Sequence, residues 1–156
     1  MIVSPEIQTI LNVVKKYLNK EVIFGYPDYE RPNGDYVVMY LIDEKPIGYA
    51  QNNMSIDGKI ITLKKMFDIQ ICFDCIGKNP YSFASYLTTM WELPSIHDAL
   101  MEKGISWHKS YSTRNTTMLL DEKYQQRLTF EANFYIDKTI TESINFIEKV
   151  NINGIN

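Results

Sequence analysis

The stretch that decides the fold runs from Met66 to Trp91 and reads MFDIQICFDCIGKNPYSFASYLTTMW. Its first half alternates between apolar and mostly polar residues with a period of two, the pattern of a β-strand with one buried face. The apolar positions are Phe67, Ile69, Ile71, Phe73 and Cys75, and the opposite face carries Asp68, Gln70, Cys72 and Asp74. We therefore predict a half-buried strand at 67–75.

The second half of this stretch predicts a turn and a helix. Gly77 and Lys78 reverse the chain, and Asn79-Pro80 is typical of a helix start, because Asn caps free amides and Pro needs no hydrogen bond there. Apolar residues then recur at helical spacing, namely Phe83, Ala84, Leu87, Met90 and Trp91. The strand and the helix are expected to pack together as the centre of the fold.

Before this centre we predict a helix, a short strand and a longer strand. Residues 5–19 begin with a capping Ser4, a Pro and an acid, and then carry an apolar stripe at 3–4 spacing. Residues 22–24 are typical of a short strand, and the Gly and Pro residues within 25–34 are typical of a loop. Residues 36–42 are apolar at every position, which favours a strand covered on both faces, by a helix on one side and by another subunit on the other.

A polar hairpin is predicted next, after a bend at 43–46. Residues 47–55 and 59–66 read as two polar strands joined at Asp57-Gly58, a favoured turn pair. Such an arm, at about 47–66, is either solvated or in contact with a polar partner. Further on, Pro94 is expected to end one element and Ser95 to cap a short helix that stops near Gly104.

The last strong strand is predicted at 124–137, where apolar and polar residues alternate as they do at 67–75. The two strands are expected to pair, with their apolar faces on the same helices. A short extended piece at 105–108 and a polar loop or edge segment at 109–121 precede it. The tail from about 139 to 156 fits either a helix or a strand.

These elements predict a single α+β domain over 1–156, with an antiparallel or mixed sheet of about four to five strands and two to three helices on one face. The chain has 156 residues, 45% of them hydrophobic and 22% charged, and a net charge of −3, all ordinary for a soluble domain. Without a dense Lys/Arg run, sequence-specific nucleic-acid binding is not expected. Neither a signal peptide nor a membrane helix is encoded, so a cytoplasmic origin is expected.

The sequence nominates no catalytic, cofactor or metal site, so we predict that the chain is not an enzyme. Cys72 and Cys75 form a C-x-x-C, but on a strand they point to opposite faces about 10 Å apart, which favours packing over redox or zinc chemistry. His97 and His108 have no second ligand at suitable spacing, and no glycine-rich phosphate loop occurs. The charged outer faces of the strands are expected to be solvated or mated to a neighbouring subunit.

Three segments, in their order and spacing, resemble the neck terminator (tail terminator, or tail completion) proteins of tailed bacteriophages. They are RPNGDYV at 31–37, FDIQICF at 67–73 leading through Gly77 into the next helix, and LDEKYQQR at 120–127 leading into the alternating strand. The family tends to place an acidic residue, an Arg and a small residue at the start of that last strand. Here Gln126-Arg127-Leu128 keeps the Arg and departs at both neighbours.

The resemblance implies a structural virion protein, made in the host cytoplasm, that forms a ring at the head–tail junction, typically of six copies. The ring would cap the tail tube protein and join it to the head connector, with DNA passing through the lumen as cargo. On this basis we predict contacts between subunits through Arg31, Lys64, Lys65 and Arg127.

Three other interpretations remain open at this stage. One is a different head–tail connector or a tail-tube subunit, although a tube subunit would show more strand. A second is a small-molecule-binding or enzymatic α+β domain, which would need an apolar pocket with convergent polar groups. A third is a partner-binding module with no viral role. Monomeric behaviour in solution would favour either of the last two.

Overall fold

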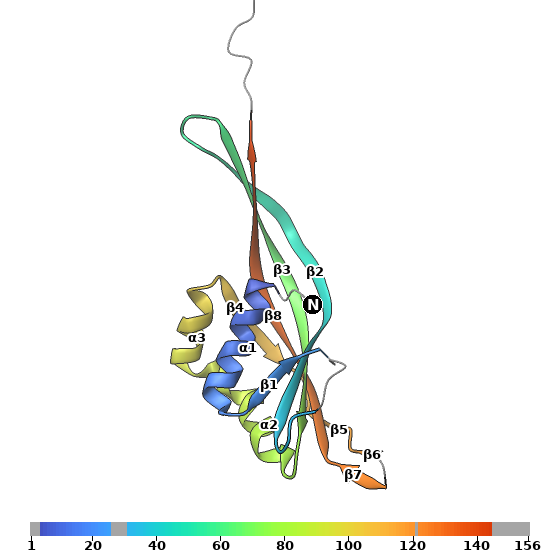
Figure 1. Cartoon of the computed structure of the whole chain (residues 1–156). Coiled ribbons are helices and arrows are strands. Elements are labelled where there is room, and N and C mark those ends of the chain that lie inside the picture. The colour runs from blue at the N-terminus through green and yellow to red at the C-terminus, as the bar shows by residue number, and fades with distance from the viewer. Residues whose placement is uncertain (1–3, 26–30, 121, 145–156) are drawn as a thin grey trace, which may run out of the picture.

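A computed structural model of the chain describes residues 4–25, 31–120 and 122–144, and it has an α+β fold with three helices on one face of a mixed sheet (Figure 1). The elements are α1 (Pro5–Leu18), β1 (Glu21–Phe24), β2 (Tyr36–Met54), β3 (Ile60–Ile76), α2 (Pro80–Thr89), a 3₁₀ turn η1 (Met90–Glu92), α3 (Pro94–Met101), β4 (Ile105–Ser110), β5 (Arg114–Asn115), β6 (Met118–Leu120), β7 (Lys123–Gln125) and β8 (Arg127–Ser143). The predicted fold class is confirmed.

The sheet is built around the pair of long strands β3 and β8. Its order is β1-β2-β3-β8-β4, and the two-residue β5 also pairs with β8. Only the pairing of β1 with β2 is parallel, whereas β3 and β8 run antiparallel along their whole length, from Ile76 opposite Arg127 to Ile60 opposite Ser143. The predicted pairing of the two alternating strands is therefore confirmed.

The core lies between this pair of strands and the helices. The alternate residues of β3 predicted to face inward are buried from Ile69 onward, as is the stripe predicted for the 80–91 helix. Phe73 stacks on Phe130 with ring centroids 5.0 Å apart, and Trp91 meets Phe134 edge-on at 5.0 Å. Burial of such rings contributes a few kcal/mol each, so this aromatic layer holds the helices on the sheet.

The helix starts follow the predicted local chemistry at α1 and depart from it at α2 and α3. The Ser4 hydroxyl accepts a hydrogen bond from the Ile7 amide at 3.4 Å, as predicted, whereas Asn79 occupies the cap position of α2 without a side-chain capping bond. The prediction that Pro94 ends an element and Ser95 caps the next is wrong. Pro94 is the first residue of α3, and Leu93 is its cap. Pro suits this position because an amide in the first turn has no partner within the helix.

The strands are longer than the sequence predicts. β2 runs through the predicted bend at 43–46 to Met54, with register shifts between Leu41 and Asp43 and between Ile47 and Gln51. Such β-bulges bend a strand without ending it. At the other end, β8 extends to Ser143, so the first part of the ambiguous tail is strand, and residues 145–156 lie outside the described part of the chain.

The face of the sheet opposite the helices carries a second, smaller apolar cluster. Tyr36, Val38 and Ile76 are buried there, with Ile23 and Tyr40 packed beside them. The start of β2 is thus buried on both faces, as the run of apolar residues predicts, but the second face is covered by residues of the same chain and not by another subunit. Burial does not extend over the whole predicted run, because Ile42 is 46% exposed.

The turn at Gly77 yields a test of this architecture. A Cβ at Gly77 would lie 2.0 Å from Oδ1 of Asp35 and 2.9 Å from its Cα, and the backbone φ of +155° disfavours L side chains. Gly77→Ala is therefore expected to lower the free energy of unfolding by about 1–3 kcal/mol, measured by urea denaturation. Gly48→Ala is the control, because its φ of +60° is strained but nothing lies within 4 Å. Equal losses at the two sites would contradict the predicted clash.

Candidate assembly surfaces

The described residues contain no group of three or more His, Cys, Asp or Glu side chains placed to hold a metal ion. Cys72 and Cys75 are both buried free thiols on opposite faces of β3. Burial raises the pKa of Cys72 to about 11 and also raises the pKa of Cys75, so neither forms a reactive thiolate at neutral pH. None of the helices in the described ranges is long and apolar enough to span a membrane.

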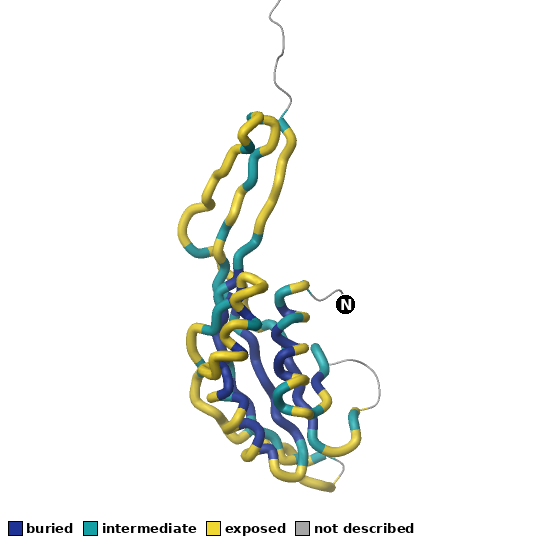
Figure 2. Tube along the Cα trace, turned by 90° about the vertical axis from the view of Figure 1, so that its left-hand side faces the viewer, coloured by how far each residue is buried: buried dark blue, intermediate teal, exposed yellow. Residues whose placement is uncertain are grey.

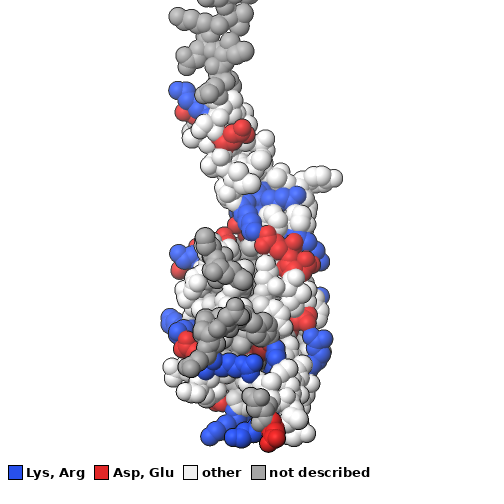
Figure 3. All heavy atoms as spheres, turned by 45° about the vertical axis from the view of Figure 1, so that its right-hand side comes forward, with Lys and Arg blue, Asp and Glu red and all other residues white. Residues whose placement is uncertain are grey.

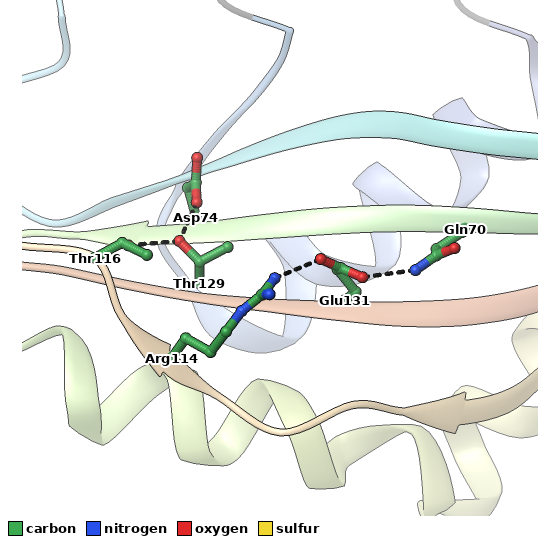
Figure 4. A network of polar contacts seen from close by, with 6 residues as sticks. All are labelled: Gln70, Asp74, Arg114, Thr116, Thr129 and Glu131. Carbon is green, nitrogen blue, oxygen red and sulfur yellow. Dashed lines mark hydrogen bonds and ion pairs between the residues drawn. The ribbon is translucent and has the colours of Figure 1, made fainter.

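The polar face of β3 and β8 forms a network within the chain (Figure 4). The Thr129 hydroxyl donates to Oδ1 of Asp74 at 2.5 Å and contacts the Thr116 hydroxyl at 2.7 Å. Glu131 accepts hydrogen bonds from Arg114 at 2.5 Å and from Gln70 at 2.6 Å. The expectation that this face is solvated or mated to a neighbour is therefore wrong for these acids, because cross-strand partners satisfy them.

At the end of this network Arg127 forms an ion pair with Asp74. The Asp74 side chain is fully buried, and that of Arg127 is 16% exposed. A buried carboxylate is costly unless a cation and hydrogen-bond donors surround it. Arg127 and Thr129 of β8 supply them, which ties β8 to β3 close to the turn that leads into α2.

A second acid, Asp35, holds the turn between β3 and α2 in place. Oδ2 of Asp35 accepts from Nζ of Lys20 at 3.0 Å, and Oδ1 accepts from the backbone amide of Lys78 at 2.9 Å. The Lys20 hydrogen bond, followed by that of the Lys78 amide, holds the pKa of Asp35 below its ordinary value. Asp35 thereby joins the end of α1, the start of β2 and the turn before α2.

This lowered pKa predicts a pH dependence of stability. Because the folded chain favours the charged form of Asp35, its contribution is present above the unfolded pKa of about 4 and is lost as pH falls through the folded value. The urea midpoint of the wild type is expected to drop more steeply below about pH 4 than that of Asp35→Asn. Parallel curves for the two proteins between about pH 7 and about pH 2.5 would contradict this.

The most prominent surface feature is a three-stranded arm that projects from the body (Figures 1 and 2). We define the arm as residues 43–54 of β2, 60–66 of β3 and 137–143 of β8, which stay paired to the tip. No arm residue is buried, and Figure 2 shows the arm exposed or intermediate throughout. The residues of β3 alone extend it by about 20 Å. A sheet this exposed has no core of its own.

Ion pairs gather where the arm meets the body. Lys64 lies 3.0 Å from Asp137, Lys138 pairs with Glu44, and Lys45 lies 3.8 Å from Asp68. On the face drawn in Figure 3, cations and anions are interspersed and no single sign dominates. Exposed pairs of this kind contribute at most about 1 kcal/mol each, so they orient the arm more than they stabilise it.

One face of the arm continues the core face of the sheet and carries apolar residues on both sides of the cross-strand pair Lys65 and Lys138. Along β3 and β8, Phe67 faces Ile136 and Leu63 faces Ile140. Leu63 is 39% exposed and Ile140 is 68% exposed, although both lie in line with fully buried core positions. These residues border a groove of about 440 Å³ at the base of the arm, which Glu6 of α1 closes on one side. We call this the arm groove, and its remaining lining residues are Ala50, Lys65, Phe67, Lys138 and Thr139.

The four residues predicted to contact other subunits lie in two separate places. Lys64 and Lys65 are on the arm, Lys64 in its ion pair and Lys65 in the arm groove. Arg31 is exposed beside a groove of about 650 Å³ at the opposite end, between the 31–36 segment and β7, and Arg127 begins β8 near that end. The structure brings Arg127 to Asp74 but does not bring the four together, and their role between subunits remains a prediction.

Sequence reasoning missed the third strand of the arm. Residues 137–143 read DKTITES, where only Ile140 is strongly apolar, so their pattern does not distinguish a strand from a helix. What identifies this segment as a strand is the register in which β8 pairs with β3. A hairpin arm at 47–66 extends β3 beyond the core, and β8 follows β3 residue by residue until Ile60.

A family model described as "Phage neck terminator protein" matches residues 6–156. A similar solved structure is the sheath/tube terminator of an extracellular contractile injection system (PVC) in its extended state, determined by cryo-EM. It is 10% identical with a TM-score of 0.42, and the match covers all of this chain and 64% of that one. No curated protein sequence matches the chain.

Proposed function

The chain belongs to the phage neck terminator protein family, and on this premise we propose that copies of it close into a ring that ends the tail tube and joins it to the head connector. Its role is structural: it terminates a tail as a component of the virion. In the proposal the whole chain acts as one terminator domain whose arm reaches a neighbouring copy. DNA passes through the lumen without sequence-specific contacts.

The observation that carries this proposal is the arm. Its strands are paired and regular, yet its apolar face lies open where the core face of the sheet runs out. Exposed apolar surface on a soluble protein usually marks a contact with another molecule. An isolated three-stranded sheet with no buried residue gains its stability from such a contact.

A ring is the assembly that fits an arm of this kind. An arm on one side of a subunit that contacts a different surface on the next makes a heterologous interface, which repeats until the rotation closes. The interspersed charges in Figure 3 suit a channel for DNA, because a strongly cationic lining would hold the phosphates. The connector and the tube then bind the two ends of the ring.

A paired substitution on the arm tests this function. Leu63→Asn with Ile140→Asn makes the apolar face polar, and because both residues are exposed, the urea midpoint is expected to change little. Ring formation and binding to tube ends, seen by light scattering and negative-stain imaging, are expected to fall by a factor of about ten or more. Leu119→Asn on β6 is the matched control, since Leu119 is 59% exposed and lies off the arm. An arm variant that caps tubes like the wild type would overturn the proposal.

A further inference from the structure

The arm groove carries a pair of lysines, of which only one is compensated within the chain. Lys65 of β3 and Lys138 of β8 are direct cross-strand partners, so their side chains leave the same face of the sheet. Like charges placed directly opposite each other destabilise a pair of strands. Lys138 is compensated by Glu44 and lies over the Phe67 ring at 4.8 Å, whereas no ion pair of Lys65 occurs in the described part of the chain.

The groove is therefore apolar at its floor, and its edge carries Glu6 of α1 and two lysines, of which Lys65 has no ion pair in the described part of the chain. Leu63, Phe67 and Ile140 supply the floor, and the two lysines stand beside them. At about 440 Å³ the groove has room for a large apolar side chain with its neighbours. A partner that fits it presents an exposed apolar residue flanked by carboxylates.

The chain carries such a surface on α3. Met101 and Glu102 follow Asp98 by about one helical turn, so the three side chains share one side of the helix. Met101 is 52% exposed and Asp98, in contact with His97 at 3.4 Å, is 77% exposed in its side chain. We call these three residues the α3 patch.

The acids of the α3 patch oppose the helix dipole. They lie in the last turn and at the C-cap of α3, where the partial negative charge of the helix end disfavours anions. The last turn carries no basic residue. The acids of the α3 patch and Lys65 of the arm groove thus carry charges that are unfavourable within the subunit and complementary to one another.

We propose that the α3 patch of one copy occupies the arm groove of the next copy. Met101 enters the apolar floor, and Asp98 and Glu102 face Lys65 and Lys138 of the neighbour. Because the two surfaces lie on different elements, one copy uses both at once, which makes the contact heterologous and lets it repeat around a ring. This inference rests on the proposed function and names the interface through which the ring closes.

A charge exchange tests the interface. Lys65→Glu is expected to weaken ring formation on the order of tenfold, because it turns an attraction into a repulsion. The same change places a carboxylate opposite Lys138 and is expected to leave the urea midpoint of the subunit unchanged or raised. Combining Lys65→Glu with a single reversal on α3, either Asp98→Lys or Glu102→Lys, is expected to restore assembly for the acid that faces Lys65, because Lys138 keeps its charge and its remaining acidic partner. Lys123→Glu, on β7 at the other end of the molecule, is the control and is expected to assemble normally.

A covalent trap gives a second readout. Leu63→Cys combined with Met101→Cys places one thiol in each surface, and the native Cys72 and Cys75 stay unreactive because they are buried. Mild oxidation is expected to link neighbouring copies into a ladder of multimers on a non-reducing gel. Either single variant is expected to give dimers at most. Where the chain assembles only at tube ends, both tests are made on capped tubes.

The outcomes separate this inference from the proposed function. Rings or caps that persist in Lys65→Glu and give no ladder would overturn the groove as the interface and leave the terminator role standing. Loss of assembly in Lys65→Glu without rescue by the exchanged charges would also overturn it, because the lysine would then serve another surface. A wild-type chain that neither assembles nor caps tubes would overturn both.

Discussion

Replacing Arg127 by alanine is expected to lower the free energy of unfolding by about 3–5 kcal/mol. The change removes the guanidinium that pairs with Asp74 and leaves a fully buried carboxylate without it. Thr129 still donates to Asp74, but one neutral hydroxyl does not replace a cation. Urea denaturation followed by tryptophan fluorescence measures the loss.

The matched control replaces both partners. Asp74→Leu with Arg127→Met removes the charge pair together and fills the space with apolar groups, so this double variant is expected to be more stable than Arg127→Ala. An Arg127→Ala protein as stable as the wild type would contradict the structural role of the pair. It would also return Arg127 to the set of side chains available for contacts between subunits.

Replacing Trp91 by alanine is the second large effect, with an expected loss of about 3–5 kcal/mol. Trp91 is 1% exposed, packs edge-on against Phe134 and lies 5.9 Å from the Phe73 ring. Its removal leaves a cavity between the helices and the sheet that the long, paired strands β3 and β8 cannot close. The midpoint of thermal or urea unfolding measures the effect.

Trp91→Phe separates the packing of Trp91 from its polar atom. The indole N–H is buried and has no acceptor among the described residues, so phenylalanine keeps most of the ring contacts and removes an unsatisfied donor. We expect Trp91→Phe to cost less than about half as much as Trp91→Ala. A loss as large as that of the alanine variant would show that the indole N–H, and not the ring packing, stabilises this position.

The sequence predicts the core of this fold because the core follows local rules. Alternation at 67–75 fixes which face of β3 is buried, and helical spacing at 83–91 fixes which side of α2 meets it. The pairing of β3 with β8 follows because only one other strand has a matching apolar face. These inferences depend on residue polarity alone, which the sequence states directly.

Polarity alone does not reveal what a polar residue contacts. Asp74 reads as a solvated charge on an outer face, yet it is buried because Arg127, fifty-three residues away, reaches it. The arm shows the same limit, since the strand at 137–143 is defined by pairing with β3 and not by its own pattern. Pro94 reads as a stop, but in the first turn of a helix the missing amide costs nothing.

The measurement that tests the central claim most directly is the mass of the wild-type chain in solution by light scattering, followed by negative-stain imaging after mixing with tail tubes. We predict a closed multiple of the 18.2 kDa chain, in solution or on the tube, and a cap at one end of each tube. A chain that remains monomeric at high concentration and leaves both tube ends bare would contradict it.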